Sequence, residues 1–220
     1  YYLELVEANG HVKEKDLLSL RLSRSDPLTP KIERLAQRVR RKTNVTIRPF
    51  SKRNYLSDVR LLVEIYHDAW SENWGFVPLT ENEINEMAKN LKRALEPDLV
   101  FFINYEDEPV GVGMVLPDFN PMLKELNGSI SISGLIKYLF RHKNVTGARA
   151  LMGGVKKKVR NLGLPVVIFD YLNQLLRKDT RMDYFEMGWN LEDNDAINKL
   201  ELAIGAHVRT RYRVFRKDFV

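Results

Sequence analysis

The stretch that decides the fold is GGVKKKVRNLGLP, residues 153–165, between an apolar strand pattern and an amphipathic helix pattern. A helix N-terminus presents unpaired backbone N–H groups and the positive end of the helix dipole, so it can hold a pyrophosphate with few charged side chains. Gly163 has no Cβ to keep a phosphate from the backbone, and Arg160 and the lysines at 156–158 add positive charge. The pattern predicts a phosphate site, although ordinary basic turns share it.

Outward from this stretch, strand and helix patterns alternate. Period-two or continuous apolar runs indicate strands at 45–50, 99–106, 109–117, 148–155 and 184–190, with a terminal strand pair at 207–217. The strands at 99–106 and 109–117 are expected to form a hairpin. Helical spacing indicates helices at 55–70, after Thr80, at 164–177 and at 195–204. The fold class is therefore α/β (α+β), with a mixed central sheet flanked by helices.

Residues 1–44 form a separate N-terminal segment in this interpretation. They contain a helix, a stop at Gly10, a charged strand and a basic helix at 31–42 whose apolar positions are Ile32, Leu35 and Val39. A similar helix-glycine-strand unit recurs around Gly205, so the segment is a candidate for the end of a preceding, similar lobe. Its apolar strand is then expected to pair with the sheet of domain 45–220 or with a second copy of the chain.

An insertion at 118–144 interrupts domain 45–220 and carries helical patterns of its own. Connections longer than about 15 residues tend to be functional. We expect either a lid over a pocket or a surface for another subunit, which leaves a homodimer open.

Composition excludes several classes of protein. The 220 residues are 44% hydrophobic and 29% charged, as in an ordinary globular protein, and no apolar run approaches the roughly 20 residues of a membrane span. With no Cys and four unpaired His, disulfides, thiolate nucleophiles and metal sites are not expected. The net charge of +6 suits an anionic ligand or a solvated basic surface. We expect a cytoplasmic protein without a membrane partner, and no nucleic acid.

The segment from Val155 to Pro165 resembles the GNAT superfamily of acyl-CoA-dependent N-acyltransferases. In that family a strand ending in Val is followed by Arg or Gln, two residues, Gly, one residue, and Gly or Ala, which opens the helix that cradles the CoA pyrophosphate. The resemblance implies that the backbone N–H of Val155 supports the oxyanion and that CoA is bound by Val155, Arg160, Asn161, Leu162, Gly163 and Leu164. Pro165 departs from the pattern and removes one N–H donor.

A second resemblance lies at 184–208, where Asn194 and Gly205 match the family in spacing. It implies that Asn194 contacts the pantetheine arm. The family often has a Tyr four residues before that Gly to protonate the departing thiolate, and this sequence has Glu201 there. The acid is then Tyr212 or Tyr171, or the chemistry is altered or lost.

The resemblance also implies that residues 67–79 wall the acceptor site, which makes His67, Trp70, Asn73 and Trp74 candidate substrate contacts. The two tryptophans equally suit a packed core, and His67 a structural role. Asp118 and Asn120, placed where a strand end meets the cleft, are further candidates, or else they cap a helix. Glu186 and Glu192 are candidate bases, since burial near the cleft would raise the pKa of a carboxyl.

The expected function is that of a GNAT-type N-acyltransferase. Acetyl-CoA or another acyl-CoA is the expected cosubstrate, and an amine of a small molecule or peptide attacks it directly, without a metal. Two alternatives stay open: a GNAT-fold binding module that does not catalyse, and a tRNA-dependent aminoacyl transferase.

Overall fold

The computed structural model describes residues 1–26, 30–125, 145–179 and 181–218. Within this part of the chain, seven strands form one sheet in the order β2-β3-β4-β5-β6-β1-β7. The strands are β1 (Val12–Ser23), β2 (Thr46–Pro49), β3 (Val100–Tyr105), β4 (Glu108–Pro117), β5 (Gly147–Val155), β6 (Tyr184–Leu191) and β7 (His207–Arg216). The mixed sheet with flanking helices confirms the predicted fold class.

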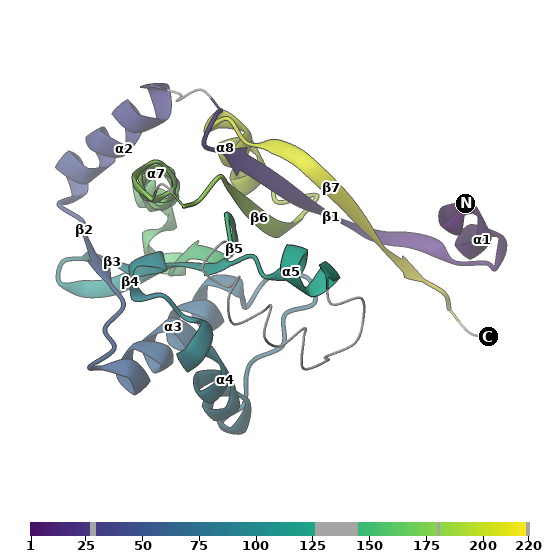
Figure 1. The fold of residues 1–220 in the computed structure, drawn as a ribbon, viewed down its shortest axis with the longest axis horizontal. Coiled ribbons are helices and arrows are strands. Elements are labelled where there is room, and N and C mark those ends of the chain that lie inside the picture. The colour runs from purple at the N-terminus through teal and green to yellow at the C-terminus, as the bar shows by residue number, and fades with distance from the viewer. Residues whose placement is uncertain (27–29, 126–144, 180, 219–220) are drawn as a thin grey trace.

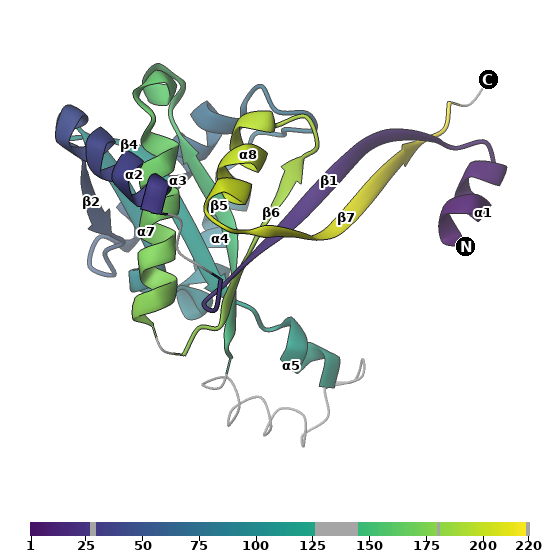
Figure 2. The ribbon, with the colours of Figure 1, turned by 90° about the horizontal axis from the view of Figure 1, so that it is seen from above.

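Helices cover both faces of the sheet (Figure 1). The helices of the described residues are α1 (Tyr2–Ala8), α2 (Pro30–Thr43), α3 (Tyr55–Trp70), α4 (Glu81–Ala94), α5 (Asn120–Glu125), α7 (Leu164–Lys178) and α8 (Asp195–Ala203), with 3-10 turns η1 (Pro97–Leu99) and η3 (Lys157–Leu162). Of these, α1 lies at the outer end of the β1–β7 ribbon and covers neither face (Figure 2). Thr80 begins α4 with the expected cap, because its hydroxyl accepts from the Glu83 N–H while the Glu83 carboxylate accepts from the Thr80 N–H.

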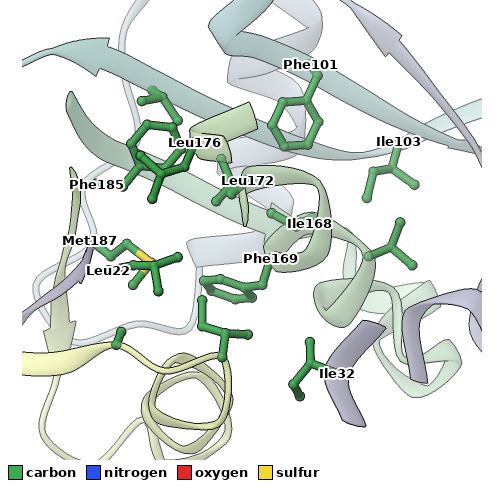
Figure 3. Close-up of a cluster of buried hydrophobic side chains, with 14 of the residues drawn as sticks. Leu22, Ile32, Phe101, Ile103, Ile168, Phe169, Leu172, Leu176, Phe185 and Met187 are labelled. Carbon is green, nitrogen blue, oxygen red and sulfur yellow. The ribbon is translucent and has the colours of Figure 1, made fainter. Parts of the chain in front are cut away.

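Two hydrophobic cores hold the layers together. Beneath α7, Ile168, Leu172 and Leu176 pack against Phe101 and Phe185 of the sheet (Figure 3). On the opposite face, side chains of α3 and α4 form the second core over β3 and β4. Each large apolar side chain removed from water contributes about 1.5–3 kcal/mol, so these two cores fix the positions of α3 and α7 on the sheet.

The sheet is antiparallel except where β5 runs parallel to β6. The predicted hairpin is confirmed as β3 and β4. The parallel pairing extends only from Gly147 and Tyr184 to Ala150 and Met187. At that point Leu151 forms a bulge in β5, since Met114 pairs with Met152 but Val115 pairs with Ala150. Beyond it β5 and β6 diverge, as can be followed in Figure 2.

The N-terminal strand is part of this sheet. The expected helix, glycine and strand are present as α1, Gly10 with φ +76°, and β1. The pairing expected for the strand is also confirmed, since β1 lies between β6 and β7.

Two details of the sequence interpretation are wrong. Residues 207–217 do not form a strand pair but the single strand β7, because β1 pairs along its length from Val12–Arg216 to Arg21–His207. In α2 the buried side chains are Ile32 and Ala36, while Leu35 is 38% exposed. Residues four apart lie on the same face of a helix, and this is the face that α2 packs against α7. The lid or subunit surface expected at 118–144 falls mostly outside the described residues, which include α5 there.

No helix among the described residues is long and apolar enough to cross a lipid bilayer.

Candidate active site

A cleft opens where β5 and β6 part. Two adjoining cavities, of about 520 and 600 Å³, share Trp70, Asn73, Trp74, Gly153, Phe169, Leu191, Asn194 and Ile197, so they are two ends of one cleft. We call the larger cavity the loop end, lined also by Val155, Arg160 and Pro165. The other is the aromatic end, lined also by Tyr66, Phe76, residues 187–190 and Glu201. Cavities of this size suit small-molecule ligands.

The loop end contains part of the predicted phosphate site. Val155 and Arg160 line it, whereas Asn161, Leu162, Gly163 and Leu164 are not among its lining residues. Leu164 is fully buried in the core and Leu162 packs against the same core. A Cβ at position 163 would lie 3.3 Å from Cγ2 of Val39 in α2, so this glycine faces α2.

Carboxylates of α3 and the turn after it engage the basic side chains of the loop. Lys156 pairs with Glu64 at 2.6 Å, and Glu72 pairs with Lys157 at 2.9 Å and with Arg160 at 3.5 Å. The Lys157 ammonium, with Arg160 as a lesser contributor, lowers the pKa of Glu72. An incoming phosphate therefore competes with an exposed carboxylate for these cations.

Of the candidate acceptor-site residues in α3 and the loop after it, three line the cleft and one, His67, does not. Trp70, Asn73 and Trp74 line both ends of the cleft. Trp74 is 44% exposed and so is not core, while the Trp70 ring lies over β5, where a Cβ at Gly154 would be 2.4 Å from Cη2. The Trp70 ring occupies the space that a side chain at position 154 would need, which explains why this position of β5 is a glycine.

His67 has a structural contact. Its Nε2 accepts from the Leu79 backbone N–H at 2.9 Å, and its ring lies beside those of Tyr66 and Phe76. This contact ties the loop before α4 to α3. His67 is not among the residues that line the cleft.

Asp118 and Asn120 lie at the other end of β5. Asp118 is buried, accepts from both the backbone and side-chain N–H groups of Asn120, and accepts from the Tyr184 hydroxyl at 3.0 Å. Its N–H donates to the carbonyl of Gly147, the first residue of β5, whereas the first β5 residue that lines the cleft is Ala150. The expectation that this strand end meets the cleft is therefore wrong.

The candidate bases have lowered, not raised, pKa values. Burial opposes ionisation of Glu186, but hydrogen bonds from Arg21 and Ser19 outweigh it and lower the pKa. The Lys13 ammonium, at 2.7 Å, lowers the pKa of Glu192. Neither carboxylate is among the residues that line the cleft, and neither has the electrostatics expected of a base poised near neutrality.

The candidate acids are also placed apart from the cleft lining. Tyr212 is on β7, with its ring 5.8 Å from that of Trp189. Tyr171 is on α7, where its ring lies 4.5 Å from that of Phe101 and burial raises its pKa.

Glu201 is the ionisable group that sequence reasoning set aside. It is 3% exposed, lines the aromatic end, and accepts a hydrogen bond from Asn190 Nδ2 at 2.7 Å. Burial raises its pKa to about 7, against a smaller lowering by Asn190. One signal was available in the sequence: Glu201 stands four residues after Ile197, on the inward stripe of α8.

Comparisons with known proteins give two curated relatives. The chain is 33% identical to Protein YghO of Escherichia coli, with 99% of this chain and 57% of that protein aligned. It is 35% identical to the bacterial ceramide synthase of Caulobacter vibrioides, over 96% of this chain and 56% of that protein. The chain thus spans about half the length of the curated relatives it matches. No protein-family model matches it.

Among solved structures, a GCN5-related N-acetyltransferase from Sphaerobacter thermophilus superposes with a TM-score of 0.62 at 17% identity. The match covers 98% of this chain and 55% of that one.

Proposed function

Because the chain has the fold of the GCN5-related N-acetyltransferases, we propose that it transfers an acyl group from acyl-CoA to the nitrogen of an amine. The main support for the proposal is that β5 and β6 stop pairing after Ala150 and Met187 and leave a cleft between them. In the described part of the chain no strand pairs with the β6-facing edge of β5 beyond Ala150. That edge offers backbone hydrogen bonds to an extended ligand, and the pantetheine arm of CoA carries two amide groups.

The loop end suits the diphosphate portion of the cosubstrate. Arg160 donates to the Ala69 carbonyl at 2.6 Å, which fixes its guanidinium at the cleft wall. In the proposed complex Arg160 and Lys157 exchange Glu72 for phosphate oxygens, and Asn194 meets the arm where the two ends join. Pro165 has no backbone N–H, so in the proposed complex the Arg160 and Lys157 side chains replace part of the hydrogen bonding that backbone N–H groups at a helix N-terminus give a phosphate.

The thioester then lies near the junction of the two ends. The amine attacks the carbonyl carbon from the aromatic end, the backbone N–H of Val155 stabilises the oxyanion, and the C–S bond breaks with its electron pair on sulfur. Phe169 and Met187, which belong to the main core, line the cleft and keep water away from the reacting atoms (Figure 3).

We extend the proposal to a long-chain substrate. The Caulobacter relative is named a ceramide synthase, and a ceramide joins a fatty acyl group to a long-chain amine. In this chain Trp74, Leu151 and Trp189 line the aromatic end while 44%, 47% and 63% exposed, which is an apolar surface for a hydrocarbon chain. An acetyl group and a polar amine are the alternative pair.

A binding module without catalysis is the second candidate. Pro165 at the start of α7 and Glu72 on the loop cations both favour weak CoA binding.

The test combines binding with turnover. Isothermal titration with CoA and acetyl-CoA measures the cosubstrate site, and release of CoA is followed with a thiol reagent, to which a chain without Cys contributes no background. Palmitoyl-CoA and acetyl-CoA are each offered with sphinganine and with spermidine. We expect heat from CoA and thiol release with at least one pair, fastest for palmitoyl-CoA with sphinganine. Heat without release for any pair favours the binding module, and no heat at millimolar CoA contradicts both proposals.

A further inference from the structure

Among the residues that the structure describes, no cation pairs with the buried carboxyl at the aromatic end. Glu201 is 3% exposed, and in the described part of the chain its hydrogen bond comes from the neutral amide of Asn190. Burying an unpaired carboxylate is costly, so such groups shift toward the protonated form. A core position could have been filled by an apolar residue at no such cost. The site therefore retains a group that exchanges a proton.

Several charged groups on the surrounding elements pair with one another. On β6, β1, α7 and α8 they form pairs of 2.7–3.0 Å, which are Glu186–Arg21, Glu192–Lys13, Asp16–Arg213, Asp170–Arg40 and Asp195–Lys199. Tyr66 of α3 lines the same end of the cleft. Burial is accordingly the main cause that raises the pKa of Glu201 to about 7, where a carboxyl both gives and takes protons at neutral pH.

Glu201 lies on the side of α8 that lines the cleft. Asn194 and Ile197, at the start and first turn of α8, line both ends of the cleft, and Glu201 lines the aromatic end one turn further on. An amine that enters from the aromatic end therefore passes the carboxyl before it reaches the junction.

We propose that Glu201 relays the proton of the acyl transfer, from the attacking amine to the departing thiolate. The inference rests on the proposed function. As the C–N bond forms, the amine nitrogen becomes positively charged and gives one proton to the Glu201 carboxylate. As the C–S bond breaks, the electron pair stays on sulfur, and the carboxylic acid gives the same proton to the thiolate. The products are an amide and CoA thiol, and Glu201 is again ionised.

The test measures CoA release from palmitoyl-CoA and sphinganine against pH for the wild type, Glu201→Gln and Asn190→Ala. In the wild type, kcat is expected to rise with pH through about 7, because the relay begins ionised. Glu201→Gln is expected to lower kcat by about 10²–10⁴ and to abolish this rise, the usual range for losing a positioned proton-transfer group. Asn190→Ala removes the hydrogen bond that stabilises the carboxylate and is expected to move the rise to higher pH.

Asp170→Asn is the matched control. Asp170 is also a buried carboxyl whose pKa is raised by desolvation, but it lies at a separate cavity of about 240 Å³ beside α2. It is expected to keep both kcat and the pH profile. An infrared difference spectrum between about pH 6 and about pH 8 adds a readout independent of turnover, in which Glu201→Gln is expected to lose a protonated-carboxyl band.

The outcomes separate the relay from the proposed function. If Glu201→Gln binds CoA, keeps the wild-type kcat and shows the same rise with pH, the relay is overturned while the acyltransferase proposal stands. A wild-type chain that binds CoA yet releases no thiol with any amine contradicts the proposed function, and the relay falls with it.

Discussion

The burial of Glu201 predicts a specific dependence of stability on pH. The pKa of its carboxyl rises from 4.5 to about 7 on folding. Because the folded state holds this proton more tightly than the unfolded state, the free energy of unfolding falls as pH rises from 4.5 to about 7 and then levels. A rise of about 2.5 pKa units at 1.36 kcal/mol per unit gives a loss of about 3 kcal/mol above neutrality, as an upper value.

Glu201→Gln removes this titration. Relative to the wild type, the variant is expected to gain about 3 kcal/mol at pH 8 compared with pH 4.5, or roughly 6–12 °C in Tm for a chain of this length. Urea unfolding of both proteins at a series of pH values measures the gain. The change with pH matters more than the absolute value, because a packing effect of the new amide is the same at every pH.

The control is Glu86→Gln, which removes an exposed carboxylate of α4 paired with Lys89. It is expected to leave the pH dependence unchanged, since exposed pairs contribute little. A constant difference between Glu201→Gln and the wild type from pH 4.5 to pH 8 would refute the reasoning about burial.

Three further variants test the loop and the cleft wall. Gly163→Val is expected to destabilise the chain by about 1–3 kcal/mol in urea unfolding, because φ is +76° there and Val39 is close, whereas an unchanged midpoint would contradict the strained geometry. Glu72→Gln frees Lys157 and Arg160 and is expected to tighten CoA binding in isothermal titration, with Glu86→Gln as the control that should not. Gly154→Ala places a Cβ against the Trp70 ring and is expected to displace it, seen as a change in tryptophan fluorescence and a slower thiol release. An unaltered emission spectrum would show that the ring does not lie where described.

Local patterns predicted much of the fold. Hydrophobic periodicity identified α3, α4 and α7 and the β3–β4 hairpin, because each of these depends on residues close together in the chain. The place of β1 between β6 and β7 and the early end of the β5–β6 pairing depend on distant partners, which no local pattern specifies. The side-chain partners of a strand are set by the sheet as a whole.

The candidate site was harder to predict for the same reason. The motif around Gly163 correctly predicted a loop between a strand and a helix. Which of its residues face the cleft depends on α2, which Gly163 faces, and on the core beneath α7, where Leu162 and Leu164 pack. The sequence places Glu201 where the family often has Tyr, and only the packing of α8 over the cleft shows that this carboxyl is buried.

The sheet is completed by segments that are far apart in the chain. Asp16 of β1 is nearly fully buried and holds Arg211 and Arg213 of β7, partners separated by 195 and 197 positions. During synthesis β1 leaves the ribosome long before β6 and β7, so its backbone groups and the Asp16 carboxylate lack their β6 and β7 partners until those strands appear. Long-range strand pairing of this kind slows folding and lengthens the exposure of apolar edges. We therefore expect the folding rate to depend mainly on when β1 docks, while the local β3–β4 hairpin forms earlier.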